Sequence, residues 1–141
     1  MGRIIALDYG KKRIGIAVTD SLQLIATPLT TVHTPEVLHF LQQYTQKEIV
    51  ESLVVGLPRN LNGTPSAMTE VVAKFVKMLA KNFPQQHIFE YDERYSSKIA
   101  QASLLQGGFS RKDKHNKGNV DKLSAAIILQ SFLTAQPECH L

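Results

Sequence analysis

Hydrophobic positions form uninterrupted runs at the start of the chain and recur with other periods further on. Residues 3–8 are mostly apolar until the run ends in a carboxylate, as in a strand buried on both faces. A second apolar run follows after a short turn, and so short a connection requires an antiparallel hairpin. A third extended stretch contains Pro28, which suits the edge of a sheet. We expect three strands, at residues 3–8, 14–19 and about 25–32, in an antiparallel meander.

From Thr34 onwards the hydrophobic period becomes helical. Thr34 is expected to cap a helix, with Pro35 at the first helical position. Two further strands then alternate with helices, which implies parallel pairing with right-handed crossovers. The predicted strands are 53–57 and 87–91, and the predicted helices begin near residues 35, 65, 96 and 120. The helix near residue 65 carries Met68, Val71, Val72, Phe75, Val76 and Leu79 on one side, and the last helix ends near Leu133. We therefore predict an α/β domain with a five-stranded mixed sheet, a three-strand antiparallel meander plus two parallel strands, flanked by helices. This is the element order of an RNase H-like fold.

The length of 141 residues fits one compact domain. We assign it to residues 1–135, followed by a short tail at 136–141. The single cysteine, Cys139, excludes a disulfide framework and favours a reducing, cytoplasmic location. The apolar runs are too short to span a membrane, and we expect no secretory signal.

Positive charge is concentrated in one segment. The formal net charge is +4, and residues 94–122 alone hold seven Lys or Arg against two Asp, an excess of +5. Such clustering is typical of a protein that binds a polyanion, although a solvated basic loop would look the same. Residues 107–118 lie in this segment, lack periodicity and are bounded by glycine, as in a functional loop.

Asp8 is the first candidate for a catalytic or metal-binding residue. It ends an apolar strand in phase with Ile4 and Ala6, where an unpaired charge would be costly. The alternative is an aspartate that only begins a turn. Carboxylates from different chain segments can hold two divalent ions roughly 4 Å apart, as phosphodiester hydrolysis requires.

Two more acids could complete such a site. Asp121 shares a helical stripe with Ala125, Ile128 and Phe132, but an acid in a first helical turn is also favoured by the helix dipole. Glu93 follows Asp92 at the end of the fifth strand, and neighbouring residues of a strand point to opposite faces, so one of the two is expected in a site. A surface ion pair with a nearby cation is the alternative for Glu93.

The glycines after Asp8 also allow a different interpretation. The pattern Asp8-x-Gly10-x-x-x-x-Gly15 also fits the phosphate-binding hairpin of the actin, hexokinase and sugar-kinase superfamily. Those proteins clasp ATP between two such lobes, whereas this chain has one copy of the motif. We therefore do not expect ATP binding.

Four motifs in order along the chain resemble the YqgF family, also called RuvX. They are Leu7-Asp8-Tyr9-Gly10 leading to Lys12-Arg13-Ile14-Gly15; Val55-Gly56-Leu57-Pro58 with Asn62-Gly63-Thr64; Asp92-Glu93-Arg94 with Ser96-Ser97; and Val120-Asp121 with Ala125-Ala126 and Ile128-Leu129-Gln130. The resemblance covers almost the whole chain. Two positions depart from the common pattern, Lys11 and Arg59, and both add positive charge.

The resemblance implies an RNase H-like fold related to the junction resolvase RuvC. It also implies a catalytic and metal-binding triad of Asp8, Glu93 and Asp121 with two Mg²⁺ or Mn²⁺ ions. The implied activity is endonuclease cleavage that matures the 5′ end of pre-16S rRNA. Two alternatives are a Holliday-junction resolvase of DNA recombination and repair, and a non-catalytic RNA-binding factor of ribosome assembly. A trimming nuclease can be a monomer, whereas a resolvase needs the two sites of a homodimer.

Under this interpretation the basic side chains gain a role, because phosphate contacts position a nucleic acid without reading its sequence. The expected phosphate-binding residues are Lys11, Arg13, Arg94, Lys98, Arg111, Lys112, Lys114 and Lys117.

Overall fold

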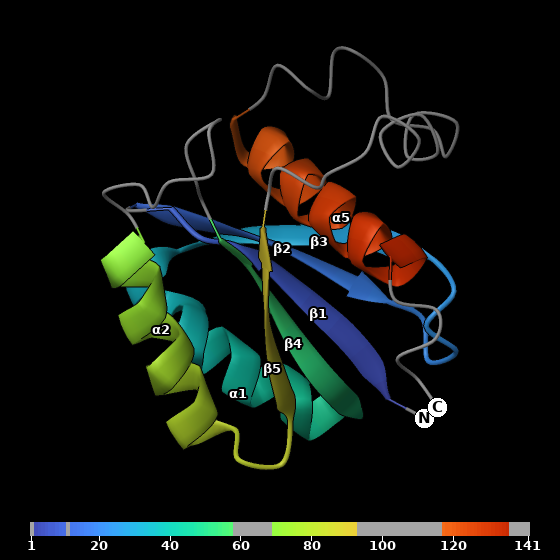
Figure 1. The fold of residues 1–141 in the computed structure, drawn as a ribbon, viewed down its shortest axis with the longest axis horizontal. Coiled ribbons are helices and arrows are strands. Elements are labelled where there is room, and N and C mark those ends of the chain that lie inside the picture. The colour runs from blue at the N-terminus through green and yellow to red at the C-terminus, as the bar shows by residue number, and fades with distance from the viewer. Residues whose placement is uncertain (1, 11, 58–68, 93–116, 136–141) are drawn as a thin grey trace.

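A five-stranded mixed sheet forms the centre of the protein (Figure 1). The computed structural model describes residues 2–10, 12–57, 69–92 and 117–135, and among these the side chains of residues 57, 69, 92, 117–121 and 135 are outside the description. The strands are β1 (Arg3–Asp8), β2 (Arg13–Thr19), β3 (Ala26–His33), β4 (Val50–Leu57) and β5 (His87–Asp92). They lie in the order β3-β2-β1-β4-β5.

The strand directions confirm the predicted sheet. β1 pairs antiparallel with β2, and β2 pairs antiparallel with β3. β1 pairs parallel with β4, and β4 pairs parallel with β5. Pro28 lies in β3, at the edge of the sheet, where a residue without an N–H is tolerated.

Three α-helices and one short 3₁₀ helix accompany the sheet in the described ranges. They are η1 (Thr34–Glu36), α1 (Val37–Lys47), α2 (Thr69–Asn82) and α5 (Lys117–Ala135). α5 begins earlier than the expected Val120, so Lys117 and Gly118 belong to a helix and not to the basic loop. The helix predicted to open at Ser96 or Ser97 lies outside the described residues.

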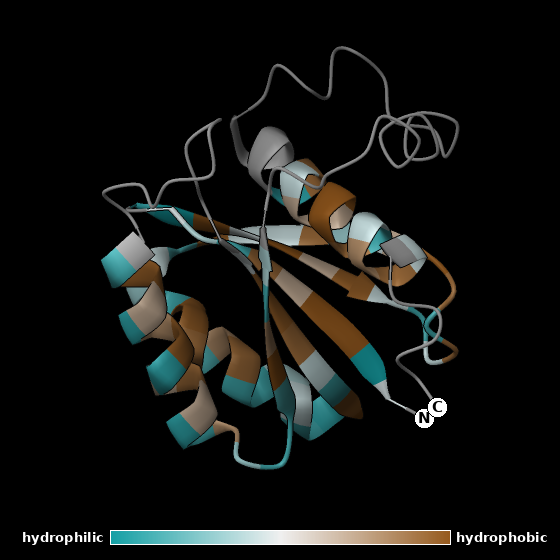
Figure 2. Cartoon of the chain, viewed as in Figure 1, coloured by the Kyte–Doolittle hydropathy of each residue, from teal (hydrophilic) through white to brown (hydrophobic). Residues whose placement is uncertain are grey.

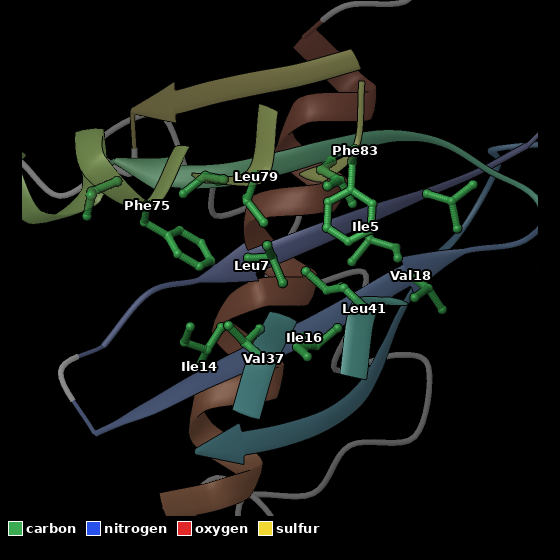
Figure 3. Close-up of a cluster of buried hydrophobic side chains, with 14 residues drawn as sticks. Ile5, Leu7, Ile14, Ile16, Val18, Val37, Leu41, Phe75, Leu79 and Phe83 are labelled. Carbon is green, nitrogen blue, oxygen red and sulfur yellow. The ribbon is translucent and has the colours of Figure 1, made fainter. Parts of the chain in front are cut away.

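One face of the sheet packs against α1 and α2. Alternate side chains of β1 and β2 point into this layer and meet Val37 and Leu41 of α1 and Leu79 of α2 (Figure 3). The strand residues involved are Ile5, Leu7, Ile14, Ile16 and Val18. The period of two within each strand therefore divides its apolar residues between two layers.

The other face packs against α5, and we call it the α5 face. Ile4 and Ala6 of β1 contribute to it, together with Ala125, Ile128 and Leu129 of α5. Phe132 of α5 is tilted against Phe89, with ring centroids 5.2 Å apart, and stands edge-on to Tyr91 at 6.1 Å. Both faces are covered, which explains why β1 is hydrophobic at consecutive positions (Figure 2).

The predicted apolar side of α2 is buried only in part. Val71 is 40% exposed, whereas Val72, Phe75 and Leu79 are buried. The buried residues recur at intervals of three and four, and Val71 lies beside that stripe. Figure 2 shows that α2 carries hydrophobic residues along one side and hydrophilic residues along the other.

Within the described ranges, no helix combines the length and apolar character that a membrane span requires.

Candidate active site

The parallel strands β1, β4 and β5 end at one border of the sheet, which we call the carboxyl edge. Their last residues are Asp8, Leu57 and Asp92. Leu7 is paired with Val55, and Val55 with Glu90, so the three strand ends are nearly level. In open α/β sheets, ligands bind beyond the carboxyl ends of the strands. This edge is therefore the expected position of an active site.

Asp8 stands at the carboxyl edge on the α5 face. Ile4 and Ala6 are both buried on that face, and Asp8 is the next residue in phase with them. Asp8 itself is only half-buried. The strand therefore carries one carboxylate to the rim of a covered face.

The turn after Asp8 is held in place by three contacts. The ring of Tyr9 packs against Phe75 of α2, with centroids 4.9 Å apart. The Thr34 hydroxyl donates a hydrogen bond to the Gly10 carbonyl oxygen at 2.7 Å. The backbone N–H of Thr34 donates to the Lys12 carbonyl oxygen at 3.0 Å. The β1–β2 turn is thereby fixed to the end of β3.

This arrangement corrects the prediction for Thr34. Its hydroxyl does not cap a helix: His33 is the N-cap residue of η1, and η1 has no side-chain capping bond. The Thr34 hydroxyl donates its hydrogen bond to the Gly10 carbonyl oxygen instead. The antiparallel meander brings these two residues together, although they are 24 positions apart in the sequence.

α5 carries Asp121 in its first half. Ala125, Ile128 and Phe132, which follow Asp121 at helical spacing, are all buried on the α5 face. The side chain of Asp121 lies outside the described side chains. Its predicted stripe is therefore confirmed as the stripe by which the helix packs on the sheet.

The direction of α5 adds a second fact about position 121. Near its end, Gln130 accepts a hydrogen bond from the N–H of Ala26 at 3.4 Å, at the border opposite the carboxyl edge. From there the helix runs back over β2, β3 and β1 (Figure 1). The helical rise from Gln130 to Asp121 is about 13.5 Å, and β1 from Ile4 to Asp8 spans about 13 Å. The backbone at position 121 is accordingly near the level of Asp8.

Among the predicted phosphate-binding residues, Arg13 is described in full. It begins β2, is half-buried, and is in phase with Ala17 of the α5 face. Lys117 lies in α5, but its side chain is outside the description. Glu93 and the other predicted cations, Lys11, Arg94, Lys98, Arg111, Lys112 and Lys114, lie outside the described residues.

Sequence reasoning left Lys12 out of the phosphate-binding set. It is exposed in the turn between Gly10 and Arg13, four residues after Asp8 in the sequence. The signal was available, because a lysine inside a turn this short has no core position to occupy. Lys12 therefore joins Arg13 as a cation at the carboxyl edge.

No cluster of three His, Cys, Asp or Glu side chains suited to a metal occurs among the residues that the structure describes. Of the predicted triad, only the side chain of Asp8 belongs to that part of the chain. The triad thus stays a prediction.

A separate hollow of about 560 Å³ lies at the opposite border of the sheet, between the end of α1 and the connection from α2 to β5. Amide side chains dominate its lining: Gln42, Gln46, Asn82, Gln85 and Gln86. Acids and histidines do not contribute to it, so it offers no group for hydrolytic chemistry.

Comparison with known proteins gives the family. The family model described as "RuvX: Holliday junction resolvase" matches residues 2–135. A protein of Amoebophilus asiaticus described as "Putative pre-16S rRNA nuclease" is 55% identical over 96% of this chain and 96% of its own length. A protein of Bacteroides thetaiotaomicron with the same description is 46% identical over 96% of this chain and 99% of its own.

Solved structures support the same fold. RuvC of Thermus thermophilus in complex with a Holliday junction substrate has a TM-score of 0.59 at 14% identity, covering 97% of this chain and 96% of that one. A second T. thermophilus RuvC structure has a TM-score of 0.53 at 15% identity, covering 96% of both chains. At these identities the likeness shows the fold alone. The five-stranded sheet is that of a RuvC-like RNase H fold, and the chain belongs to the RuvX family of nucleases.

Proposed function

We propose that this chain is a metal-dependent endonuclease that hydrolyses phosphodiester bonds in structured RNA and processes the 5′ end of pre-16S rRNA. The observation that carries the proposal is the position of Asp8, at the carboxyl edge on the face covered by α5. Relatives at 46–55% identity share the pre-16S rRNA nuclease description, which supports the choice of substrate. Work on precursor rRNA would take place in the cytoplasm.

Asp8, Glu93 and Asp121 are the residues proposed to hold two Mg²⁺ or Mn²⁺ ions. Carboxylate oxygens are the ligands that such ions prefer, and a half-buried carboxylate at the end of an apolar strand fits that use. The level of position 121, near that of Asp8, supports Asp121 as a partner. When bound, the ions would activate water and stabilise the leaving oxygen.

The remaining work falls to the chain's own cations. Lys12 and Arg13 lie at the same edge of the sheet as Asp8, where their charges would hold a phosphate backbone and stabilise the negative charge that develops during cleavage. The predicted cations of residues 94–117 would extend this contact. One such site is sufficient for trimming an RNA end, so the proposed enzyme works as a monomer.

The family description favours one other substrate, a four-way DNA junction. Resolution of a junction requires two paired incisions, and therefore two copies of the site in a homodimer. The two substrates thus differ in the oligomeric state that they demand.

A parallel cleavage assay tests the proposal. Purified chain is incubated with an RNA that carries the 5′ extension of 16S rRNA and with a synthetic four-way DNA junction, each with Mg²⁺, with Mn²⁺ and with EDTA. Asp8→Asn is compared with Glu90→Gln, an exposed acid of β5 in phase with Ile88 of the opposite face. Binding of both substrates is measured alongside cleavage.

We expect metal-dependent RNA cleavage that Asp8→Asn lowers by on the order of a hundredfold or more, with RNA binding intact and Glu90→Gln unchanged. Cleavage of the junction but not of the RNA would mean that the substrate is branched DNA, hydrolysed by the same metal-dependent chemistry. RNA binding without cleavage under any metal would support a non-catalytic assembly factor and refute the proposal.

A further inference from the structure

The edge strand β3 contains a β-bulge. Ile16 of β2 is paired with Thr30, and the next residue, Ala17, is paired with Pro28. Leu29 is therefore an extra residue that opposes no residue of β2. A bulge of this kind reverses the alternation of side chains beyond it, and such bulges are common next to active sites.

The bulge brings two polar side chains to the α5 face. Ala26, before the bulge, packs in the cluster on the α5 face. Val32, after the bulge, is paired with Ile14 and packs in the cluster on the opposite face. Thr31 and His33 alternate with Val32 and therefore point to the α5 face.

Thr31 and His33 thereby line up with Asp8 across the sheet. Gly15 is paired with Asp8 on one side and with Thr31 on the other, so these three residues form one row. Two residues further along the strands, on the same face and beyond the end of β1, Arg13 is paired with His33. From strand spacings, Arg13 lies about 8 Å from Asp8 between Cα atoms, and Thr31 about 10 Å.

The end of β3 is also held rigidly. His33 immediately precedes Thr34, whose hydroxyl and N–H bind the Gly10 and Lys12 carbonyl oxygens. His33 is exposed and Thr31 is half-exposed, so both can meet a substrate. A contact surface that is fixed before binding loses little conformational entropy on binding.

We propose that Arg13, Thr31 and His33 form a second phosphate subsite, which binds the backbone of the substrate strand beside the cleaved bond. This inference rests on the proposed nuclease function. The guanidinium, hydroxyl and imidazole can each donate a hydrogen bond to a phosphate oxygen. Ions held by Asp8 would lie within about 2–3 Å of its carboxylate oxygens, so Thr31 and His33 are positioning residues and not metal ligands.

Matched variants separate this role from a structural one. Thr31→Val removes the hydroxyl, and Thr30→Val makes the same change one residue away on the opposite face, where Thr30 pairs with Ile16. Thr31→Ser keeps the hydroxyl. His33→Ala removes the imidazole, His33→Lys keeps a donor, and His39→Ala alters an exposed histidine of α1.

The test measures kcat and KM on the RNA with the 5′ extension of 16S rRNA, and binding of the same RNA in Ca²⁺ by the Asp8→Asn protein. We expect Thr31→Val and His33→Ala each to raise KM about three- to tenfold, as the loss of one hydrogen bond does, with kcat within twofold. Thr31→Ser and His33→Lys should keep most of the affinity, and Thr30→Val and His39→Ala should match the wild type.

Two results would overturn the subsite. Either Thr31→Val and His33→Ala behave like Thr30→Val and His39→Ala, or they lower kcat while KM stays constant. Failure of the proposed function looks different. In that case the wild type does not cleave, or Asp8→Asn cleaves equally well, and the binding measurement still decides whether the subsite exists.

Discussion

A Cβ atom on Gly10 would lie 2.5 Å from the carbonyl oxygen of Arg13. The clash would be with a backbone atom, which cannot move aside as the end of a flexible side chain can. The turn between β1 and β2 can therefore have this conformation only with glycine at position 10. Asp8 lies two residues before Gly10, and Arg13 begins the return strand. The turn therefore sets the separation between the candidate carboxylate and the first cation of the site.

We expect Gly10→Ala to destabilise the protein by about 1–3 kcal/mol, the usual cost of overpacking, and to lower cleavage in the folded fraction. Urea unfolding gives the first quantity, and kcat at a temperature where the variant is folded gives the second. A Gly10→Ala protein with wild-type stability and activity would show that the turn can rearrange without consequence.

The sheet was predictable because its signals are local. Continuous apolar residues indicated that β1 is covered on both faces, a short turn required the β1–β2 hairpin, and Pro28 indicated an edge strand. Asp8 was identified for the same reason, since its phase with Ile4 and Ala6 is visible in the sequence. In each case the residues that carry the signal are a few positions apart.

The parts that could not be predicted depend on residues distant in the sequence. The bulge at Leu29 is defined by pairing with β2, and without it Thr31 and His33 would point to the opposite face. The sequence around Thr34 predicted that its hydroxyl caps a helix, but the hydroxyl donates a hydrogen bond to the Gly10 carbonyl oxygen. Local patterns contain no information about such partners.

A buried hydrogen bond at the start of β1 gives the second prediction. Thr19 is fully buried, and its hydroxyl oxygen accepts the N–H of Ile4 at 2.9 Å. Thr19→Val keeps the shape of the side chain but leaves that N–H without its acceptor, which should cost about 1–3 kcal/mol of stability. The matched control is Thr27→Val, at an exposed position of β3. Chemical denaturation measures both variants, and equal small losses would contradict the prediction.

Asp20 gives a prediction about pH. Its carboxylate accepts the N–H groups of Leu22 at 3.2 Å, Leu24 at 2.8 Å and Ile25 at 2.9 Å. The hydrogen bond from Ile25 is the main cause that holds the pKa of Asp20 below its ordinary value. Since the native pKa is lower than the unfolded one, the carboxylate stabilises the fold at neutral pH, and this contribution is lost as pH falls through the native pKa.

Asp20→Ala should therefore lower the Tm at pH 7, and the gap to the wild type should narrow below about pH 4. Thermal unfolding of both proteins at pH 7 and pH 3 measures the gap. A gap that is the same at both pH values would mean that the charge of Asp20 plays no part in stability.

The cations of the β1–β2 turn give a prediction about salt. If Lys12 and Arg13 each neutralise one phosphate, replacing either by alanine should weaken RNA binding and reduce the slope of log K against log salt by about one. Lys77→Ala, an exposed lysine of α2, is the control and should leave the slope unchanged. Fluorescence anisotropy at salt concentrations from about 50 to about 200 mM measures the slopes. An unchanged slope in Lys12→Ala and Arg13→Ala would place the phosphate backbone elsewhere.

The last prediction decides between the two acids at the end of β5. Phe89 and Tyr91 both lie against Phe132 of α5, which puts odd-numbered residues of β5 on the α5 face. Position 92 is in phase with Ile88, which packs on the opposite face. Glu93 lies outside the described residues, but a strand that keeps its alternation for one more residue would give Glu93, and not Asp92, the face of Asp8.

We therefore expect Glu93→Gln to lower kcat by on the order of a hundredfold or more, and Asp92→Asn to leave it within about threefold, the range expected of a surface change. Both substitutions remove one negative charge at neighbouring positions, so a general electrostatic effect would lower both rates equally. Metal titration of cleavage separates the two cases further, because loss of a metal ligand raises the Mg²⁺ concentration needed for half-maximal rate. If Asp92→Asn is the inactive variant, the chain must change its alternation after Tyr91, and the carboxylate set becomes Asp8, Asp92 and Asp121.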